Sequence, residues 1–322
     1  MISKCRVCGD TSISTGFVFR PYTDFETTVY DCYTCGCRFT NRDEHVYEKL
    51  HSEPSTYAAH RDLQSKAKDY FKNNDITGLE KYLKSTPKNR FVIESIKSVP
   101  NCTKILEYGC SRGYLSSFSI LLEKEFYGVD VSNTALKDAA ASFGNHFYSP
   151  ELVNTFPDAY FDLIYHVGTI GCVDDPMTFI SEQLKLLRSG GTLLFNAPNL
   201  DVCSILDLKW LTGTTPPDLV TLFPPTFWES KFSELAHISV VVEYDSPLMS
   251  YLRRKRSILV RQDEGANKTL FGNAAKKVKA SKLRRLASCA VKSVGKFLPG
   301  IGLFAKTPRY SLIGGRRMEH SF

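Results

Sequence analysis

The sequence predicts an α/β fold with a doubly wound, mostly parallel sheet, preceded by a small cysteine-rich module. Between residues 104 and 198, apolar strand-like segments alternate with helical segments, which is the pattern of a parallel sheet covered by helices on both faces. The first of these strands runs into a glycine-containing turn, Glu107–Gly113, before the first helix. Five of the ten cysteines crowd into the first 37 residues, which sets the N-terminus apart from the rest of the chain.

The expected elements follow from the period of the apolar residues. Within the alternating region we expect strands at 104–108, 126–131, 146–149, 161–167 and 192–198, and helices at 113–125, 133–143 and 176–191. Two later segments, 238–245 and 256–262, are strand-like and are expected to pair with each other. Upstream, helical spacing over 41–100 predicts several helices, the last ending at Pro100.

The N-terminal cysteines have the spacing of a metal site. Two C-x-x-C pairs, each followed by glycine, are 23 residues apart and supply Cys5, Cys8, Cys32 and Cys35. Four thiolates suit a tetrahedral structural zinc, and four protein ligands leave no open position for zinc catalysis. Cys37 is an alternative ligand to Cys35, although the C-x-x-C spacing favours Cys35.

The turn after the first strand predicts a ligand with a ribose but without a phosphate. Gly109 permits a tight turn and Gly113 close packing of the helix, while Asp130 follows Glu107 by 23 residues, a spacing suited to ribose hydroxyls. The P-loop pattern is absent, and the carboxylate of Glu107 suits a cation better than a pyrophosphate. S-adenosylmethionine, which carries a sulfonium, an ammonium and a ribose, has these properties.

Four segments, "LEYGCSRGYL", "YGVDVS", "FDLIYHVGTIGCVDDP" and "LLRSGGTLLFNAPN", together resemble the successive motifs of class I S-adenosylmethionine-dependent methyltransferases over residues 90–262. The resemblance implies a Rossmann-like, seven-stranded sheet. It also implies that the cofactor contacts Glu107, Gly109, Cys110, Gly113, Tyr114, Asp130, Val131, Ser149, His166 and Val167. Ser111 stands where the family often has glycine; a serine is tolerable there if its φ stays negative, and this is the first position at which backbone strain is to be sought.

The catalytic base is the least specified part of the site. Acidic and Glu-His positions used by relatives hold Gly168, Gly171 and Cys172 here, so no base transfers from the resemblance. A hydroxyl acceptor still requires a base near neutral pKa, and His166 is the nearest candidate by position. The alternative is that His166 is a strand-end histidine satisfied by hydrogen bonds.

The acceptor is predicted from the N-terminal module. A zinc module before such a core is similar to methyltransferases that act on sugars or glycan precursors, by O- or C-methylation, and also to some RNA methyltransferases. A third interpretation is a non-enzymatic zinc-ribbon binding protein on this fold. The loop 207–232 is expected to close over a small-molecule or glycan acceptor, its aromatic residues either forming walls or packing in the core: Trp210, Phe223, Phe227 and Trp228.

Charge divides the chain further. Residues 250–322 contain 18 Lys and Arg but 3 Asp and Glu, whereas the net charge of the whole chain is +7, so the preceding part is acidic. Segment 274–298 is basic and amphipathic, the pattern of a helix on an anionic membrane surface or a membrane-bound glycan assembly. The alternatives are a solvated helix packed back on the core, binding to nucleic acid, and docking of another partner. The N-terminus lacks an apolar signal region, so we expect a cytoplasmic protein, with peripheral contact at the inner membrane face.

The expected organisation therefore has four parts. Residues 1–45 form the zinc ribbon, 46–100 a helical linker or lid, 101–262 the methyltransferase core and 263–322 the basic tail.

Overall fold

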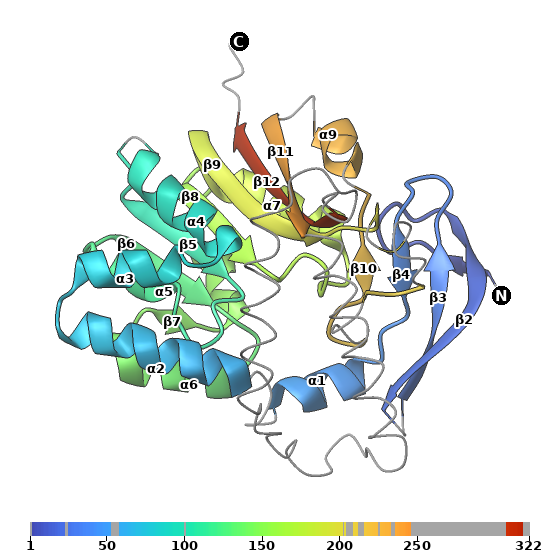
Figure 1. Ribbon diagram of the computed structural model, residues 1–322. Coiled ribbons are helices and arrows are strands. Elements are labelled where there is room, and N and C mark those ends of the chain that lie inside the picture. The colour runs from blue at the N-terminus through green and yellow to red at the C-terminus, as the bar shows by residue number, and fades with distance from the viewer. Residues whose placement is uncertain are drawn as a thin grey trace, which may run out of the picture.

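The computed structural model describes residues 2–22, 25–52, 58–99, 101–201, 203, 209–211, 216–224, 226–232, 236–245 and 307–317. It contains a seven-stranded sheet flanked by helices and a five-stranded sheet at the N-terminus (Figure 1). The expected strand 256–262 and the basic segment 274–298 lie outside the described residues. Among the residues that are described, no helix has the length and apolarity needed to span a bilayer.

The large sheet has the order β11-β12-β9-β8-β5-β6-β7, which confirms the doubly wound, seven-stranded prediction. Its parallel strands are β5 (Lys104–Tyr108), β6 (Glu125–Val129), β7 (Phe147–Tyr148), β8 (Phe161–Val167) and β9 (Leu187–Pro198). All five coincide with expected strands, although β9 begins earlier because helix α7 ends at Leu186. The carboxyl ends of these strands meet at one edge, where α/β sheets bind ligands.

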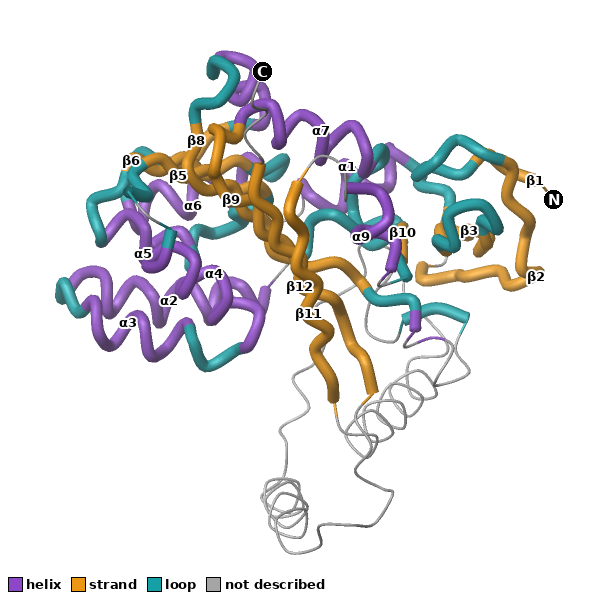
Figure 2. Tube along the Cα trace, turned by 90° about the horizontal axis from the view of Figure 1, so that it is seen from above, coloured by secondary structure: helices purple, strands orange, loops and turns teal. Residues whose placement is uncertain are grey.

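The expected strand 238–245 pairs with a segment that was not expected to form a strand, while its expected partner 256–262 lies outside the described residues. Strand β11 (Ala236–Asp245) pairs antiparallel with β12 (Thr307–Arg317), and β12 pairs antiparallel with β9. Figure 2 shows β11 and β12 side by side at the edge of the sheet, next to β9. The sheet therefore takes a strand from the segment that the sequence assigned to the basic tail. Local apolar patterning cannot identify a partner so distant along the chain.

Successive residues of the central strands serve two different cores. Ile105, Leu163 and Leu194 pack with helices that include α3 (Ile76–Leu83), α4 (Pro87–Ser98) and α5 (Ser116–Leu121). Leu106 and Ile164 pack in a second core that includes α7 (Pro176–Leu186). This alternation is the period-two pattern of a sheet buried on both faces. Helices α2 (Ala58–Lys72) and α6 (Asn133–Phe143) pack against each other, with Gln64 bonded to Asp138 and Ser142.

The cysteine module is an antiparallel sheet of five strands completed from elsewhere in the chain. Strands β1 (Ile2–Lys4), β2 (Thr11–Tyr22), β3 (Phe25–Asp31) and β4 (Arg38–Thr40) are joined by β10 (Thr221–Leu222), which pairs with β4. Four aromatic side chains of the 207–232 loop were expected either to form walls of the acceptor site or to pack in the core. They are buried and do not line the cavity described below, so they pack in the core: Trp210, Phe223, Phe227 and Trp228. The module and the second core are therefore one continuous hydrophobic unit.

Candidate active site

The turn between β5 and α5 requires its two predicted glycines. Gly109 has a φ of +68°, and a Cβ there would come within 2.4 Å of Thr169 Oγ1. Gly113 has a φ of +72°, and a Cβ there would lie 2.7 Å from the Phe147 ring. Any larger residue at either position would be strained and would also displace a neighbour. The expected roles of both glycines in a tight turn with close helix packing are consistent with this geometry.

Ser111 has the backbone strain for which its position was singled out. Its φ is +49°, in the left-handed region, so the condition of a negative φ is not met. Such a conformation costs an L-residue roughly 1–2 kcal/mol. Two contacts hold it: the Ser111 amide donates to Asp130 Oδ2 at 2.8 Å, and Ser111 Oγ lies 3.0 Å from His60 Nδ1. The serine therefore links the turn to the end of β6 and to helix α2.

Asp130 is fixed at the end of β6 by two backbone amides. Its Oδ1 accepts from Ser132 N at 2.8 Å, while Oδ2 accepts from Ser111. Burial raises the pKa of this carboxyl, and the two amide hydrogen bonds oppose that rise. Each carboxylate oxygen has a further lone pair, so Asp130 retains the capacity to accept ligand hydroxyls.

A cavity of about 530 Å³ lies at the carboxyl ends of β5, β6 and β8, and we call it the cofactor cavity. Of the residues predicted to contact the cofactor, four line it: Gly109, Asp130, Val131 and Val167. Val131 is 54% exposed, which is unusual for a valine and leaves its side chain available to an apolar ring. Ser149 is not part of the lining, but its neighbours Pro150 and Glu151 are, at the start of the 3₁₀ helix Pro150–Thr155.

Glu107, Cys110, Gly113 and Tyr114 lie outside the cavity lining. Glu107 is buried beneath the turn, where Ser116 Oγ donates to its Oε2 at 2.5 Å and Tyr165 Oη donates to the same oxygen at 2.9 Å. Burial raises the pKa of Glu107 to about 8, and the two hydrogen bonds oppose it. A carboxyl that is mostly protonated near neutral pH does not supply the negative charge that we expected to face a cationic ligand.

His166 is not placed to act as a base. It is fully buried, stacks on Phe195 with ring centroids 4.8 Å apart and lies 5.3 Å from the Phe179 ring. Within the described residues neither ring nitrogen has a hydrogen-bond partner, and burial lowers the pKa of His166 to about 3. This corrects the prediction of a catalytic His166. The alternative, a histidine satisfied by hydrogen bonds, does not describe it either, because the ring is held by aromatic packing.

The sequence did not predict four further side chains of the cavity lining, which we call the roof of the cavity. Tyr47 and His51 come from α1 (Glu44–Ser52), His60 comes from α2, and Asp218 comes from the segment before β10. His51 Nε2 lies 3.6 Å from Asp218 Oδ1, and the Tyr47 and His51 rings are 4.2 Å apart. The only local signal was the i, i+4 spacing of Tyr47 and His51, which places both on one face of a helix. The predicted lid region thus does contribute to the cavity.

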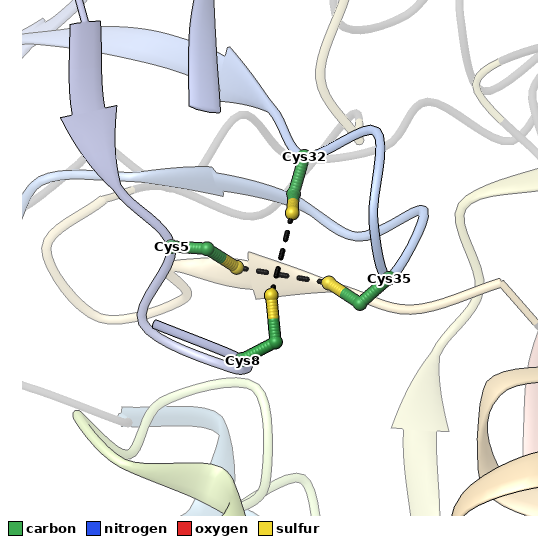
Figure 3. A group of neighbouring side chains, drawn as sticks. All are labelled: Cys5, Cys8, Cys32 and Cys35. Atoms are coloured by element: carbon green, nitrogen blue, oxygen red, sulfur yellow. Dashed lines mark hydrogen bonds between the residues drawn. The ribbon is translucent and has the colours of Figure 1, made fainter. Parts of the chain in front are cut away.

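The four predicted metal ligands converge (Figure 3). The sulfur atoms of Cys5, Cys8, Cys32 and Cys35 all lie within 4.8 Å of one another, with Cys5 and Cys35 3.6 Å apart and Cys8 and Cys32 3.5 Å apart. The glycine after each pair has a positive φ, +76° at Gly9 and +73° at Gly36, which closes the turn under the sulfurs. Cys37 is not a member of this group. The donor set is that of a tetrahedral thiolate site.

Comparison with known proteins identifies the domain that contains the turn. The family described as a methyltransferase domain matches residues 106–195, from β5 into β9. None of the curated proteins compared with the sequence matches it. The matched segment includes Gly109, in the turn after β5, and Asp130, at the end of β6.

Solved structures with a similar fold include three bacterial and archaeal proteins. A SAM-dependent methyltransferase of Archaeoglobus fulgidus is 14% identical, with a TM-score of 0.44, covering 71% of this chain and 92% of its own. The YcgJ protein of Bacillus subtilis is 17% identical, with a TM-score of 0.42, covering 70% and 97%. A possible histamine N-methyltransferase of Thermotoga maritima is 14% identical, with a TM-score of 0.41, covering 76% and 99%.

The family match thus falls on the segment whose strands, turn and Asp130 form the cofactor cavity. Residues 106–195 carry a methyltransferase domain, which confirms the prediction that the protein is an enzyme, a methyltransferase.

Proposed function

We propose that the enzyme methylates a hydroxyl group of a sugar or glycan precursor. The proposal rests on the composition of the cavity wall, which contains carboxylates, imidazoles and aromatic rings: Tyr47, His51, His60, Tyr108, Glu151, Phe179, Glu182 and Asp218. Carboxylates and imidazoles accept hydrogen bonds from hydroxyl groups. No Lys or Arg is found among the described residues that line it, whereas an RNA acceptor would need cations beside its phosphates.

The donor is proposed to lie along the strand ends. Asp130 would accept the ribose hydroxyls, the exposed Val131 would pack on the adenine, and the backbone at Gly109 would approach the methionine moiety. Bound S-adenosylmethionine supplies a methyl group that is already activated by the sulfonium. The protein then has to position the acceptor in line and exclude water, which accounts for a large part of the rate in such reactions. Tyr47, His51 and His60 line the same cavity.

His51 is proposed as the proton acceptor for the reaction. As the acceptor oxygen bonds to the methyl carbon, the carbon–sulfur bond breaks with its electron pair on sulfur, and the hydroxyl proton must leave. His51 lines the cavity, and Asp218 at 3.6 Å would stabilise the imidazolium that forms. His60 is the weaker candidate, because its Nδ1 is already engaged with Ser111 Oγ at 3.0 Å.

The cysteine cluster is proposed to hold a structural zinc ion. The four sulfurs fit a closed site, so the metal would stabilise the module and would not activate water. A site of this kind couples metal binding to folding of its module.

The acceptor assignment is tested by measuring which class of molecule receives a labelled methyl group. The enzyme is incubated with methyl-tritiated S-adenosylmethionine and, in separate reactions, a panel of nucleotide sugars, glycan oligosaccharides or total RNA. We expect label in a sugar fraction and not in RNA. Label confined to RNA would overturn the acceptor assignment while leaving the donor site intact.

A further inference from the structure

One wall of the cofactor cavity is a loop held from outside by the cysteine module. This loop, residues 168–174, follows β8, and we call it the β8 loop. Gly168, Thr169, Cys172 and Val173 from this loop line the cavity. On its outer side the backbone of β10 docks onto it, with Val220 N and Thr221 N donating to Gly171 O at 2.8 and 3.0 Å. The β8 loop therefore faces ligand on one side and module on the other.

Arg6 joins the metal-ligand pair to the same loop. It lies between Cys5 and Cys8, and its Nη1 donates to Asp174 Oδ1 at 3.1 Å. The Arg6 side chain is 13% exposed, while Asp174 is 61% exposed. A nearly buried guanidinium requires partners, and Asp174 supplies one from the β8 loop.

Arg42 makes a second and more extensive connection. Its Nη1 donates to the Cys172 carbonyl at 2.7 Å, and its Nη2 lies 3.5 Å from Asp174 Oδ2. Its guanidinium also sits 4.0 Å from the centre of the Tyr47 ring, so it touches a residue of the cavity roof. Figure 1 shows α1, which carries Tyr47, lying between the strands of the module and helix α2. Arg42 thus contacts both the wall and the roof.

We infer that Arg6 and Arg42 are positioning residues that hold the β8 loop and the Tyr47 end of α1 around the donor. Through these contacts the cysteine module fixes the position of two parts of the cofactor cavity, the β8 loop and Tyr47. The planar, five-donor guanidinium of Arg42 suits this task, because one group bonds a carbonyl, faces a carboxylate and packs on an aromatic ring at once. Donor affinity depends on these two arginines although neither lines the cavity.

The test is the affinity for S-adenosylhomocysteine, measured by calorimetry on the full chain, so it requires no acceptor and its result does not depend on the sugar assignment. It rests only on the donor assignment. We expect Arg42→Gln to weaken binding about tenfold, a typical coupling between distant sites. Arg6→Gln and Asp174→Asn should weaken it by less, since each removes fewer contacts. Arg42→Lys, which keeps the charge and a donor, should recover part of the loss.

Arg38 provides the matched control. It forms a two-pronged ion pair with Asp31 inside the module, at 2.6 and 2.9 Å, and is similarly buried at 16% exposure. Arg38→Gln should therefore lower the melting temperature without changing the affinity. An equal loss of S-adenosylhomocysteine affinity in Arg38→Gln and Arg42→Gln would overturn the inference, because it would show that any destabilisation of the module weakens binding.

Asp174 is exposed, so Asp174→Asn should fold even if an arginine variant does not. An unchanged affinity in both Asp174→Asn and Arg42→Gln would also overturn the inference. Failure of the unaltered chain to bind would overturn the donor assignment and the inference together.

Discussion

His51 and Asp218 face each other across the roof of the cofactor cavity, with Nε2 and Oδ1 3.6 Å apart, although 167 positions separate them in sequence. A carboxylate beside an imidazole stabilises its protonated form and orients the ring. His60, the second histidine of the described lining, lies 3.0 Å from the Ser111 hydroxyl through its Nδ1. The pair of His51 and Asp218 is the basis of the proposed proton transfer.

Removal of the His51 imidazole should slow turnover while leaving donor binding intact. We expect His51→Gln to lower kcat by about 10²–10⁴-fold, the usual contribution of a positioned base. Asp218→Asn should have a smaller effect in the same direction. The measurement is steady-state kinetics with the acceptor that the labelling experiment identifies, and added imidazole is expected to restore part of the rate. His45→Gln is the control, because His45 is exposed on the same helix; a loss of turnover equal to that of His51→Gln would contradict the assignment.

The metal content of the module should depend on four cysteines and not on the fifth. Elemental analysis is expected to find one zinc per chain, which Cys5→Ser and Cys32→Ser lose together with the folded state of the module. Cys37→Ser is the matched control, because Cys37 is buried nearby but outside the converging group, and it should retain zinc. Absence of metal from the unaltered protein, or its loss in Cys37→Ser alone, would refute the site.

His166 should make the protein sensitive to acid. Its pKa is about 3 in the folded chain, compared with an ordinary value of 6.5, because burial disfavours the imidazolium. The unfolded chain therefore binds a proton first as pH falls. The free energy of unfolding should decrease between about pH 6.5 and 3, by up to about 1.4 kcal/mol per pH unit. His166→Phe, which can stack on Phe195, should reduce this decrease in denaturant titrations at several pH values and should leave kcat unchanged. A large fall in kcat in a folded His166→Phe would restore His166 as a catalytic candidate.

Glu107 should have the opposite effect on stability. Burial raises its folded pKa to about 8, from an ordinary value of 4.5, so the folded chain keeps a proton that the unfolded chain releases. Stability from this group is present in full below pH 4.5 and is lost as the pH rises toward 8. Glu107→Gln keeps a hydrogen-bonding side chain without the titration and should flatten the profile between about pH 4.5 and 8. An unaltered profile in Glu107→Gln would contradict the assignment of that slope to Glu107.

Local patterns predicted the parallel part of the fold because each of its elements is short-range. Strand β5, the glycine turn and Asp130 lie within one continuous stretch, so spacing alone brought Gly109 and Asp130 to one site. The C-x-x-C pairs likewise predicted the convergence of the four cysteines, since each half is a local turn. The strand β12 was not recognised because its pairing with β9 and β11 depends on distant residues.

The roof of the site escaped prediction for the same reason. Tyr47 and Asp218 line the cavity because α1 and the segment before β10 pack on the core, and the i, i+4 spacing of Tyr47 and His51 does not indicate what that helix face contacts. His166 and Glu107 had the opposite problem. Both residues lie next to the ligand-binding motifs along the chain, as predicted, but the sequence did not indicate where their side chains point. His166 points into an aromatic core and Glu107 lies beneath the turn.

The calorimetric titration of S-adenosylhomocysteine into the unaltered chain and into Asp130→Ala tests the donor site most directly. We predict one binding site per chain in the first case. In the second we predict a loss of at least about a hundredfold in affinity, because charge-assisted hydrogen bonds to the ribose are each worth roughly 1.5–3 kcal/mol. Circular dichroism should show a folded variant. Binding of equal affinity in both proteins would contradict the role of Asp130, and no binding to the unaltered chain would contradict the cofactor site itself.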